Sequence, residues 1–200
     1  MQTLYIHPDN PQPRLINKVV QTLKNDGLII LPTQYGYVFG FEIHAKAALQ
    51  TLKQLCQLDD KYMFTLLCQN LSQVATYATI DNHQYRLLKT HTPAATTFIL
   101  DTKDIPKKLI GKHKKVGIQI LDDNLILAIL ENLNTPIVTS PVILPQHDKP
   151  LDIEEIEHYL GRHIEIFVDA GFITTQMVTT IDLTQTPPNI VRQGVVEITI

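Results

Sequence analysis

The chain has 200 residues, 44% hydrophobic and 18% charged, which is typical of a globular protein, and we expect a single domain over residues 1–200. A net charge of −3 argues against a globally basic nucleic-acid-binding protein. No apolar run is long enough to cross a bilayer and no signal-peptide core follows Met1, so we expect a cytoplasmic protein without a membrane partner. Cys56 and Cys68 fit no disulfide or metal framework, which agrees with a reducing compartment and predicts no metal site.

The first predicted elements surround a continuous apolar run. Asn10 can cap a helix whose first residue is Pro11, and residues 26–27 (Asp-Gly) end it. Residues 28–31 (Leu-Ile-Ile-Leu) then predict a strand that is buried on both faces. Pro32 predicts the end of this strand, because proline has no N–H to donate to a central ladder.

Polar side chains follow this strand at its carboxyl end. They are the hydroxyl of Thr33, the amide of Gln34 and the phenols of Tyr35 and Tyr37. In open α/β sheets, ligands bind at the carboxyl ends of the strands. This stretch is therefore the first candidate binding site.

The rest of the chain continues to alternate helices with strands, which predicts an α/β protein, and its strand-rich C-terminal part predicts a mixed sheet. Further helices are expected over residues 44–58, 71–78 and 152–160, and after the capping residues Asp81 and Asp122 or Asp123. Further strands are expected over residues 4–6, 63–67, the latter part of 92–100, 116–121, 136–140, 164–168, 178–183, 190–192 and 195–198, with a loop over 141–150.

Motifs with a known chemistry are sparse. The sequence contains no Walker loop, no GxGxxG and no HExxH, and its eight histidines form no metal-ligand pattern. The segment over residues 103–115 is rich in lysine. It could attract a polyanion such as RNA, and the alternative is an ordinary solvated surface. Its candidate RNA-binding residues are Lys107, Lys108, Lys112, Lys114 and Lys115.

Several segments, taken in order, resemble segments shared by the YrdC/YciO-like proteins. The resemblance covers nearly the whole chain with compatible spacing, so it is more specific than any single motif, and the opening residues are most similar to the YciO branch. The matching segments are residues 32–40 (P-T-E/D-x-x-Y-x-L/F-G), 92–100 (T-P-G-x-x-T-x-I-L), 116–121 (V-G-x-R-x-P), 139–142 with their neighbours (S-x-S-x-N), and 179–184 with 192–194 (T-x-x-D-L-T…R-x-G).

The resemblance implies a twisted open mixed sheet flanked by helices, with a large cavity on one side. It also implies the activity of the synthase branch, which makes L-threonylcarbamoyladenylate from ATP, L-threonine and bicarbonate for a tRNA modification. Magnesium would accompany ATP as a substrate, with no tightly bound cofactor. Members of the family are also described as binding double-stranded RNA, so structured RNA or tRNA is an implied partner.

This sequence departs from the family pattern at its cations. A further family segment, a K-x-R that ends the helix after residue 40, reads Gln54-Leu55-Cys56 here, and a register shifted by one residue would instead bring Lys53 into place. The arginine of V-G-x-R is Gln119. Each charged hydrogen bond is worth roughly 1.5–3 kcal/mol, so these losses should cost several kcal/mol of polyphosphate binding. Lys53 and Lys61 lie nearby in sequence and could substitute for the lost pair.

The resemblance supplies the candidate substrate and nucleotide site, whereas no catalytic residue can be assigned. Thr33 and Thr97 could instead satisfy backbone groups, Tyr37 could be a half-buried core phenol, and Asp182 is expected to brace a turn. Ser140 has no adjacent histidine that would activate it. The candidate binding residues are Thr33, Tyr37, Lys53, Lys61, Thr97, Gln119, Ser140 and Arg192.

Three functions follow from these residues. The leading hypothesis is a nucleotide- or RNA-binding protein on the synthase scaffold, with weak or altered synthase activity. The second is a genuine threonylcarbamoyladenylate synthase in which Lys53 and Lys61 replace the lost cations. The third is a non-catalytic double-stranded RNA-binding module that uses the lysine-rich segment.

Overall fold

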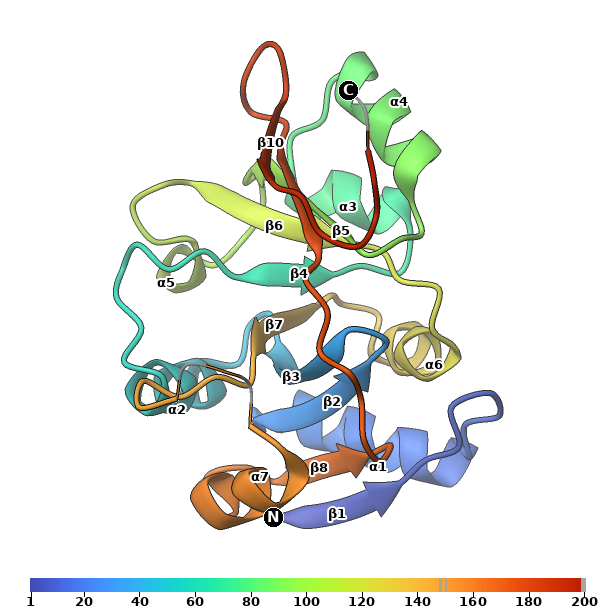
Figure 1. Ribbon diagram of the computed structural model, residues 1–200, viewed down its shortest axis with the longest axis vertical. Coiled ribbons are helices and arrows are strands. Elements are labelled where there is room, and N and C mark those ends of the chain that lie inside the picture. The colour runs from blue at the N-terminus through green and yellow to red at the C-terminus, as the bar shows by residue number, and fades with distance from the viewer. Residues whose placement is uncertain (148, 150, 199–200) are drawn as a thin grey trace.

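One open, twisted sheet runs through the molecule in this computed structural model, which describes residues 1–147, 149 and 151–198 (Figure 1). Its ten strands have the order β1-β8-β2-β3-β7-β4-β6-β5-β9-β10, and it contains both parallel pairs, such as β1 with β8, and antiparallel pairs, such as β2 with β3. The predicted mixed α/β sheet is therefore confirmed. The strands are β1 (Gln2–Tyr5), β2 (Ile29–Thr33), β3 (Gly36–Glu42), β4 (Thr65–Leu67), β5 (Thr96–Asp101), β6 (Lys115–Gln119), β7 (Ile137–Pro141), β8 (Ile166–Asp169), β9 (Thr179–Asp182) and β10 (Asn189–Arg192).

Helices cover both faces of the sheet. On one face, Val19 and Ile129 pack in a cluster with Ile29 of β2, while on the other face Leu52 belongs to the cluster of Ile30. Successive residues of β2 thus enter opposite clusters, which confirms a strand buried on both faces. Among the described residues the helices are α1 (Pro13–Lys24), α2 (Lys46–Leu55), α3 (Leu71–Tyr77), α4 (Asn82–His91), α5 (Lys107–Ile110), α6 (Asn124–Leu133) and α7 (Ile153–Leu160).

The sequence had indicated that strand β2 ends at Pro32, and this prediction is wrong. Pro32 lies within the strand and pairs with Tyr37 of β3, in a hairpin whose last pair is Thr33 with Gly36. The other neighbour, β8, is in register with β2 only at Ile29 and Ile30. A proline at position 32 therefore removes no ladder bond on that side.

The helix starts predicted from capping aspartates are confirmed, whereas the start predicted at Asn10 is not. Asp81 and Asp152 form capping boxes and Asp123 caps α6. The expected cap at Asn10 is wrong, because α1 begins two residues later with Pro13 at its first position. The ring of His7 accepts hydrogen bonds from the backbone N–H groups of Asp9 and Asn10, which holds this stretch in a turn.

The C-terminal part differs from expectation in one element. No strand forms over residues 195–198, where the Val195 N–H instead bonds to the carbonyl of Met177 and Thr179 donates to the carbonyl of Val196. The expected loop over 141–150 includes positions 148 and 150, which lie outside the described residues. None of the helices in the described ranges is both long and apolar enough to span a bilayer.

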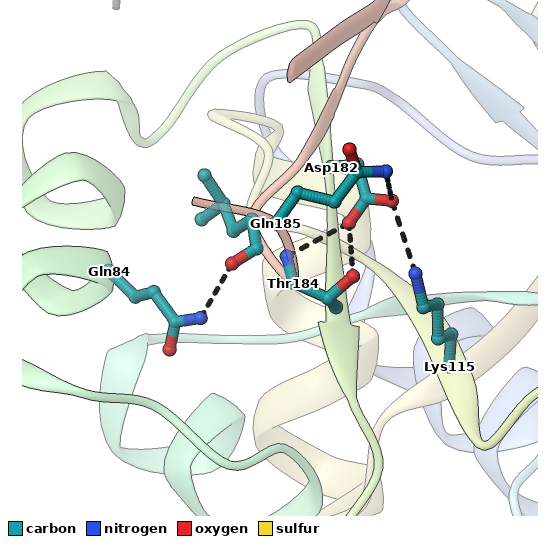
Figure 2. A network of polar contacts seen from close by, with 6 residues as sticks. Gln84, Lys115, Asp182, Thr184 and Gln185 are labelled. Atoms are coloured by element: carbon teal, nitrogen blue, oxygen red, sulfur yellow. Dashed lines mark hydrogen bonds and ion pairs between the residues drawn. The ribbon is translucent and has the colours of Figure 1, made fainter. Parts of the chain in front are cut away.

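Asp182 at the end of β9 braces the turn that follows it (Figure 2). Its carboxylate accepts bonds from the backbone and side chain of Thr184, at 2.8 and 2.6 Å, and from Gln185. Lys115 of β6 lies 3.2 Å away as an ion-pair partner. Burial alone would raise the pKa of Asp182, but these donors outweigh it and lower the pKa. The expected turn-bracing role is confirmed.

We expect Asp182→Asn to lower the free energy of unfolding by about 1–3 kcal/mol near neutral pH, because it removes charge from several partly buried hydrogen bonds. Since the folded-state pKa is lowered, the carboxylate's contribution is present above the unfolded pKa of about 3.9 and is lost as the pH falls below it. Urea unfolding at neutral pH and near pH 3 should therefore show a gap between the two proteins that narrows in acid. The exposed Asp101→Asn is the control, and a gap independent of pH would contradict this role.

Candidate functional site

A pocket of about 330 Å³ lies where the β2–β3 hairpin, the neighbouring strands and the segment 175–178 meet. Most of its polar lining consists of hydroxyl, phenol and amide groups. Six of the eight candidate binding residues line it, which are Thr33, Tyr37, Thr97, Gln119, Ser140 and Arg192. The structure thus brings together side chains that lie up to 159 positions apart in the chain, which is the separation of Thr33 and Arg192 (192 − 33).

Thr33 serves the hairpin turn at the rim of this pocket. Its hydroxyl donates to the carbonyl of Gly36 at 2.8 Å and accepts the N–H of Tyr35 at 3.2 Å. Gly36 has a φ of +127°, a backbone conformation that side chains rarely adopt. The hydroxyl of Thr33 is therefore occupied by backbone groups, as the alternative assignment expected.

Tyr37 joins the pocket to the loop that follows β8. Its hydroxyl donates to the carbonyl of Gly171 at 2.8 Å and accepts the N–H of Ala170 at 3.0 Å. Burial is the main cause that raises the pKa of Tyr37 to about 12. The phenol therefore stays neutral and anchors the loop.

Thr97 and Gln119 form one wall, where β5 and β6 are neighbours. The Gln119 side-chain amide donates to the Thr97 hydroxyl over 2.8 Å. Gly117, on the same strand, keeps this wall open, since a Cβ there would lie 2.7 Å from the Thr65 hydroxyl and 2.9 Å from the Thr97 methyl group. The wall presents neutral groups where the family pattern places an arginine.

Ser140 and Tyr62 meet in the lining of the pocket, with their hydroxyl oxygens 2.6 Å apart. Burial raises the pKa of Tyr62, and the bond with Ser140 only partly opposes that effect. Ser140 thus has a neutral phenol as its partner, not a base that would activate it as a nucleophile. Cys56 lines an adjoining cavity with both residues, and burial raises the pKa of its thiol to about 11, so it carries no charge at neutral pH.

Arg192 is the one charged side chain among the described residues that line the pocket. Its Nε donates to the carbonyl of Val178 at 3.1 Å, and one terminal nitrogen donates to the Thr180 hydroxyl at 3.2 Å. A guanidinium has five N–H donors, so three remain available for a ligand by this count. The lining thus suits a ligand with one negative group and several hydroxyls.

The other predicted residues lie elsewhere. Lys53 lines a different groove and pairs with Asp60 at 3.5 Å, and Lys61 is not part of the pocket lining. Gln34 points away, as its amide donates to the carbonyl of Asp122 at 2.7 Å. In the described ranges, no three His, Cys, Asp or Glu side chains come close enough together to hold a metal ion.

The lysine-rich segment does not form one surface. Lys107, Lys108 and Lys112 line the groove that contains Lys53, whereas Lys115 is paired with Asp182 at the sheet. The candidate RNA-binding residues are therefore divided between two places.

Sequence reasoning missed Tyr62, the threonines at 65 and 139, and segment 175–178. Thr65 and Thr139 are direct partners in the β4–β7 ladder, so correct pairing of these two strands would have found them together. Segment 175–178 offered no signal, because it has no charge, no motif and no regular structure.

Three comparisons with known proteins bear on this arrangement. The family model Sua5_yciO_yrdC, described as "Telomere recombination", matches residues 21–194. The uncharacterized protein YciO of Escherichia coli K12 is 39% identical over 197 residues, which cover 97% of this chain and 96% of YciO. An uncharacterized protein of Haemophilus influenzae is 38% identical over 197 residues, which cover 96% of this chain and 95% of that protein.

Solved structures share the fold. The crystal structure of E. coli YciO superimposes with a TM-score of 0.91 at 37% identity, covering 98% of this chain and 97% of that one. P. abyssi Sua5 in complex with L-threonine gives a TM-score of 0.87 at 18% identity and covers 97% of this chain but 58% of Sua5. The second likeness concerns the fold alone.

We expect Tyr37→Phe to lower the free energy of unfolding by about 1–3 kcal/mol, because it leaves the Ala170 N–H and the Gly171 carbonyl without their partner. Amide hydrogen exchange at Ala170 should accelerate with it. Tyr35→Phe is the matched control, since that hydroxyl makes only an exposed 3.3 Å bond to Gln34. Equal effects of the two substitutions would contradict the anchoring role.

Proposed function

The chain belongs to the Sua5, YciO and YrdC family, and we propose that its pocket binds a small hydroxylated ligand with one negative group. The reaction implied by the resemblance to the synthase branch of this family is the synthesis of L-threonylcarbamoyladenylate from ATP, L-threonine and bicarbonate. We propose that this chain performs it weakly or in altered form. The observation that carries the proposal is the pocket lining, in which Arg192 is the single charged side chain among the described residues.

The size and polarity of the pocket support a small-molecule ligand. Pockets for such ligands usually have about 300–1,000 Å³, mostly apolar walls and a few placed polar groups. This pocket has about 330 Å³ and combines Val38, Leu67 and Met177 with its hydroxyls and amides. L-Threonine, which is bound in the P. abyssi Sua5 complex, has one carboxylate, which Arg192 could receive, and one hydroxyl.

The same lining explains why ATP should bind weakly. A triphosphate needs several cations or N–H donors to offset its charge. The positions of the family's cations are held by the uncharged Gln54, Cys56 and Gln119. Of these only Gln119 lines the pocket within the described residues, and Lys53 and Lys61 also lie outside it. At roughly 1.5–3 kcal/mol for each charged hydrogen bond, the loss reaches several kcal/mol, which is a factor of at least 10² in affinity.

The proposal is tested by pyrophosphate release from the purified protein with ATP, magnesium, L-threonine and bicarbonate, each omitted in turn. We expect slow release that requires all four, well below the 1–10³ per second typical of enzymes. Release at ordinary enzymatic rates would contradict weak activity. Absence of both release and threonine binding by calorimetry would contradict the assignment of the pocket.

We expect Gln119→Arg to tighten ATP binding by about 10- to 100-fold, because it returns one cation to the wall beside Thr97. The measurement is ATP affinity by calorimetry, with pyrophosphate release as a second readout. Gln176→Arg is the control, since it adds the same charge to the segment 175–178 of the pocket. If both variants gained equally, general electrostatic attraction rather than the family position would be responsible.

A further inference from the structure

A second cavity adjoins the pocket that contains Arg192, which we call the polar pocket. The second cavity, called the side cavity below, has a volume of about 330 Å³, as the polar pocket does. Cys56 and Leu58, just after α2, form one of its walls, and residues within 141–147, after β7, form another. Figure 1 shows these two segments beside each other.

The two cavities meet at a boundary of shared residues. Tyr62, Ser140, Pro141 and Ile143 line both of them. The Tyr62 ring is held edge-on against Phe64, with 4.9 Å between the ring centroids, and its hydroxyl oxygen lies 2.6 Å from that of Ser140. A ligand in the polar pocket that extends past this hydroxyl pair therefore enters the side cavity.

The side cavity is apolar, whereas the polar pocket is rich in hydroxyls. Among the described residues, its lining contains no lysine, arginine, aspartate or glutamate. Burial raises the pKa of Cys56 to about 11, so its thiol is neutral, and the ring of His147 packs against that of Tyr159 with 5.1 Å between centroids. Such a lining favours an apolar group and offers few partners to a charged one. The apolar residues that line the side cavity but not the polar pocket are Leu58, Leu144 and Pro145.

Backbone hydrogen bonds hold the wall after β7 in place. The N–H of Val142 donates to the carbonyl of Tyr37 at 3.3 Å, and the N–H of His147 donates to the carbonyl of Leu144 at 2.9 Å. Between these bonds, the apolar side chain of Ile143 is 39% exposed. A bound apolar group would cover Ile143, and a wall that is already ordered lowers the entropic cost of binding it.

Three kinds of group follow one another across the two cavities. Arg192 lines the polar pocket alone, the hydroxyls of Ser140 and Tyr62 lie at the boundary, and the apolar residues line the side cavity. We propose that the two cavities together bind an amphipathic carboxylate, whose single negative group pairs with Arg192 and whose aliphatic chain occupies the side cavity. This inference rests on the proposed function, because it names the substrate class of the same pocket, and it adds an aliphatic chain that L-threonine lacks.

The test is calorimetric titration of the full chain with N-acetyl-, N-butanoyl- and N-hexanoyl-L-threonine. These probes share one carboxylate and one hydroxyl and differ only in the length of the aliphatic chain. Affinity should rise along the series by about fourfold for each methylene that enters the side cavity. The heat capacity change of binding should also become more negative along the series, because more apolar surface is buried.

Leu58→Asn should make the affinity nearly independent of chain length, because it places an amide in the apolar lining. Leu87→Asn is the matched control, since Leu87 is also partly buried against the same hydrophobic cluster but lines neither cavity. The control should keep the wild-type gain per methylene. Thermal melting verifies that both variants fold.

Arg192→Gln separates this inference from the proposed function. It should weaken the binding of every probe by about 10- to 100-fold and keep the gain per methylene. Binding that depends on Arg192 but not on chain length would overturn the assignment of the side cavity and leave the proposed function standing. A gain that Leu58→Asn does not reduce, or that Leu87→Asn reduces as much, would also overturn it. If no probe binds, the assignment of the polar pocket fails and this inference fails with it.

Discussion

Strand β2 connects both hydrophobic clusters, because Ile29 and Ile30 point to opposite faces of the sheet and are fully buried. Burying such side chains contributes roughly 1.5–3 kcal/mol each, and β2 does so on both faces at once. Its hairpin with β3 then places Thr33 and Tyr37 at the edge where β4, β5, β6 and β7 also deliver polar groups. The position of the pocket therefore depends on the burial of this strand.

Much of this arrangement could be predicted from local sequence. The apolar run 28–31 has the pattern of a doubly buried strand, and Asp81 and Asp152 have glutamine or glutamate three residues later, which is the capping-box pattern. The helix start at Pro13 was missed, because the ring of His7 holds Asn10 in a turn. Helix-capping propensity reflects the preferences of the residue itself. A contact from outside the helix, such as the bond from Asn10 to the His7 ring, overrides it.

The functional site was only partly predictable, and the reason is topological. Tyr62 reaches Ser140 only because β4 pairs with β7, a neighbour that is distant in sequence. The proximity of Lys53 of α2 to Lys107 and Lys108 of α5 was missed for the same reason, since the two helices are separated by about fifty residues. The resemblance to the family identified six pocket residues, because proteins that share the fold also share its strand pairing. It could not place Lys53 or Lys61, which are not part of the shared sequence pattern.

The pocket and the surface between α2 and α5 differ in charge. In the described residues, the pocket lining keeps one cation, Arg192, whereas five lysines and Asp60 line the surface between the two helices. An interior with neutral hydroxyl groups and raised tyrosine pKa values disfavours a polyanion, since little there offsets its desolvation. The pocket lining is therefore physically more compatible with a ligand that has one negative group than with a polyphosphate.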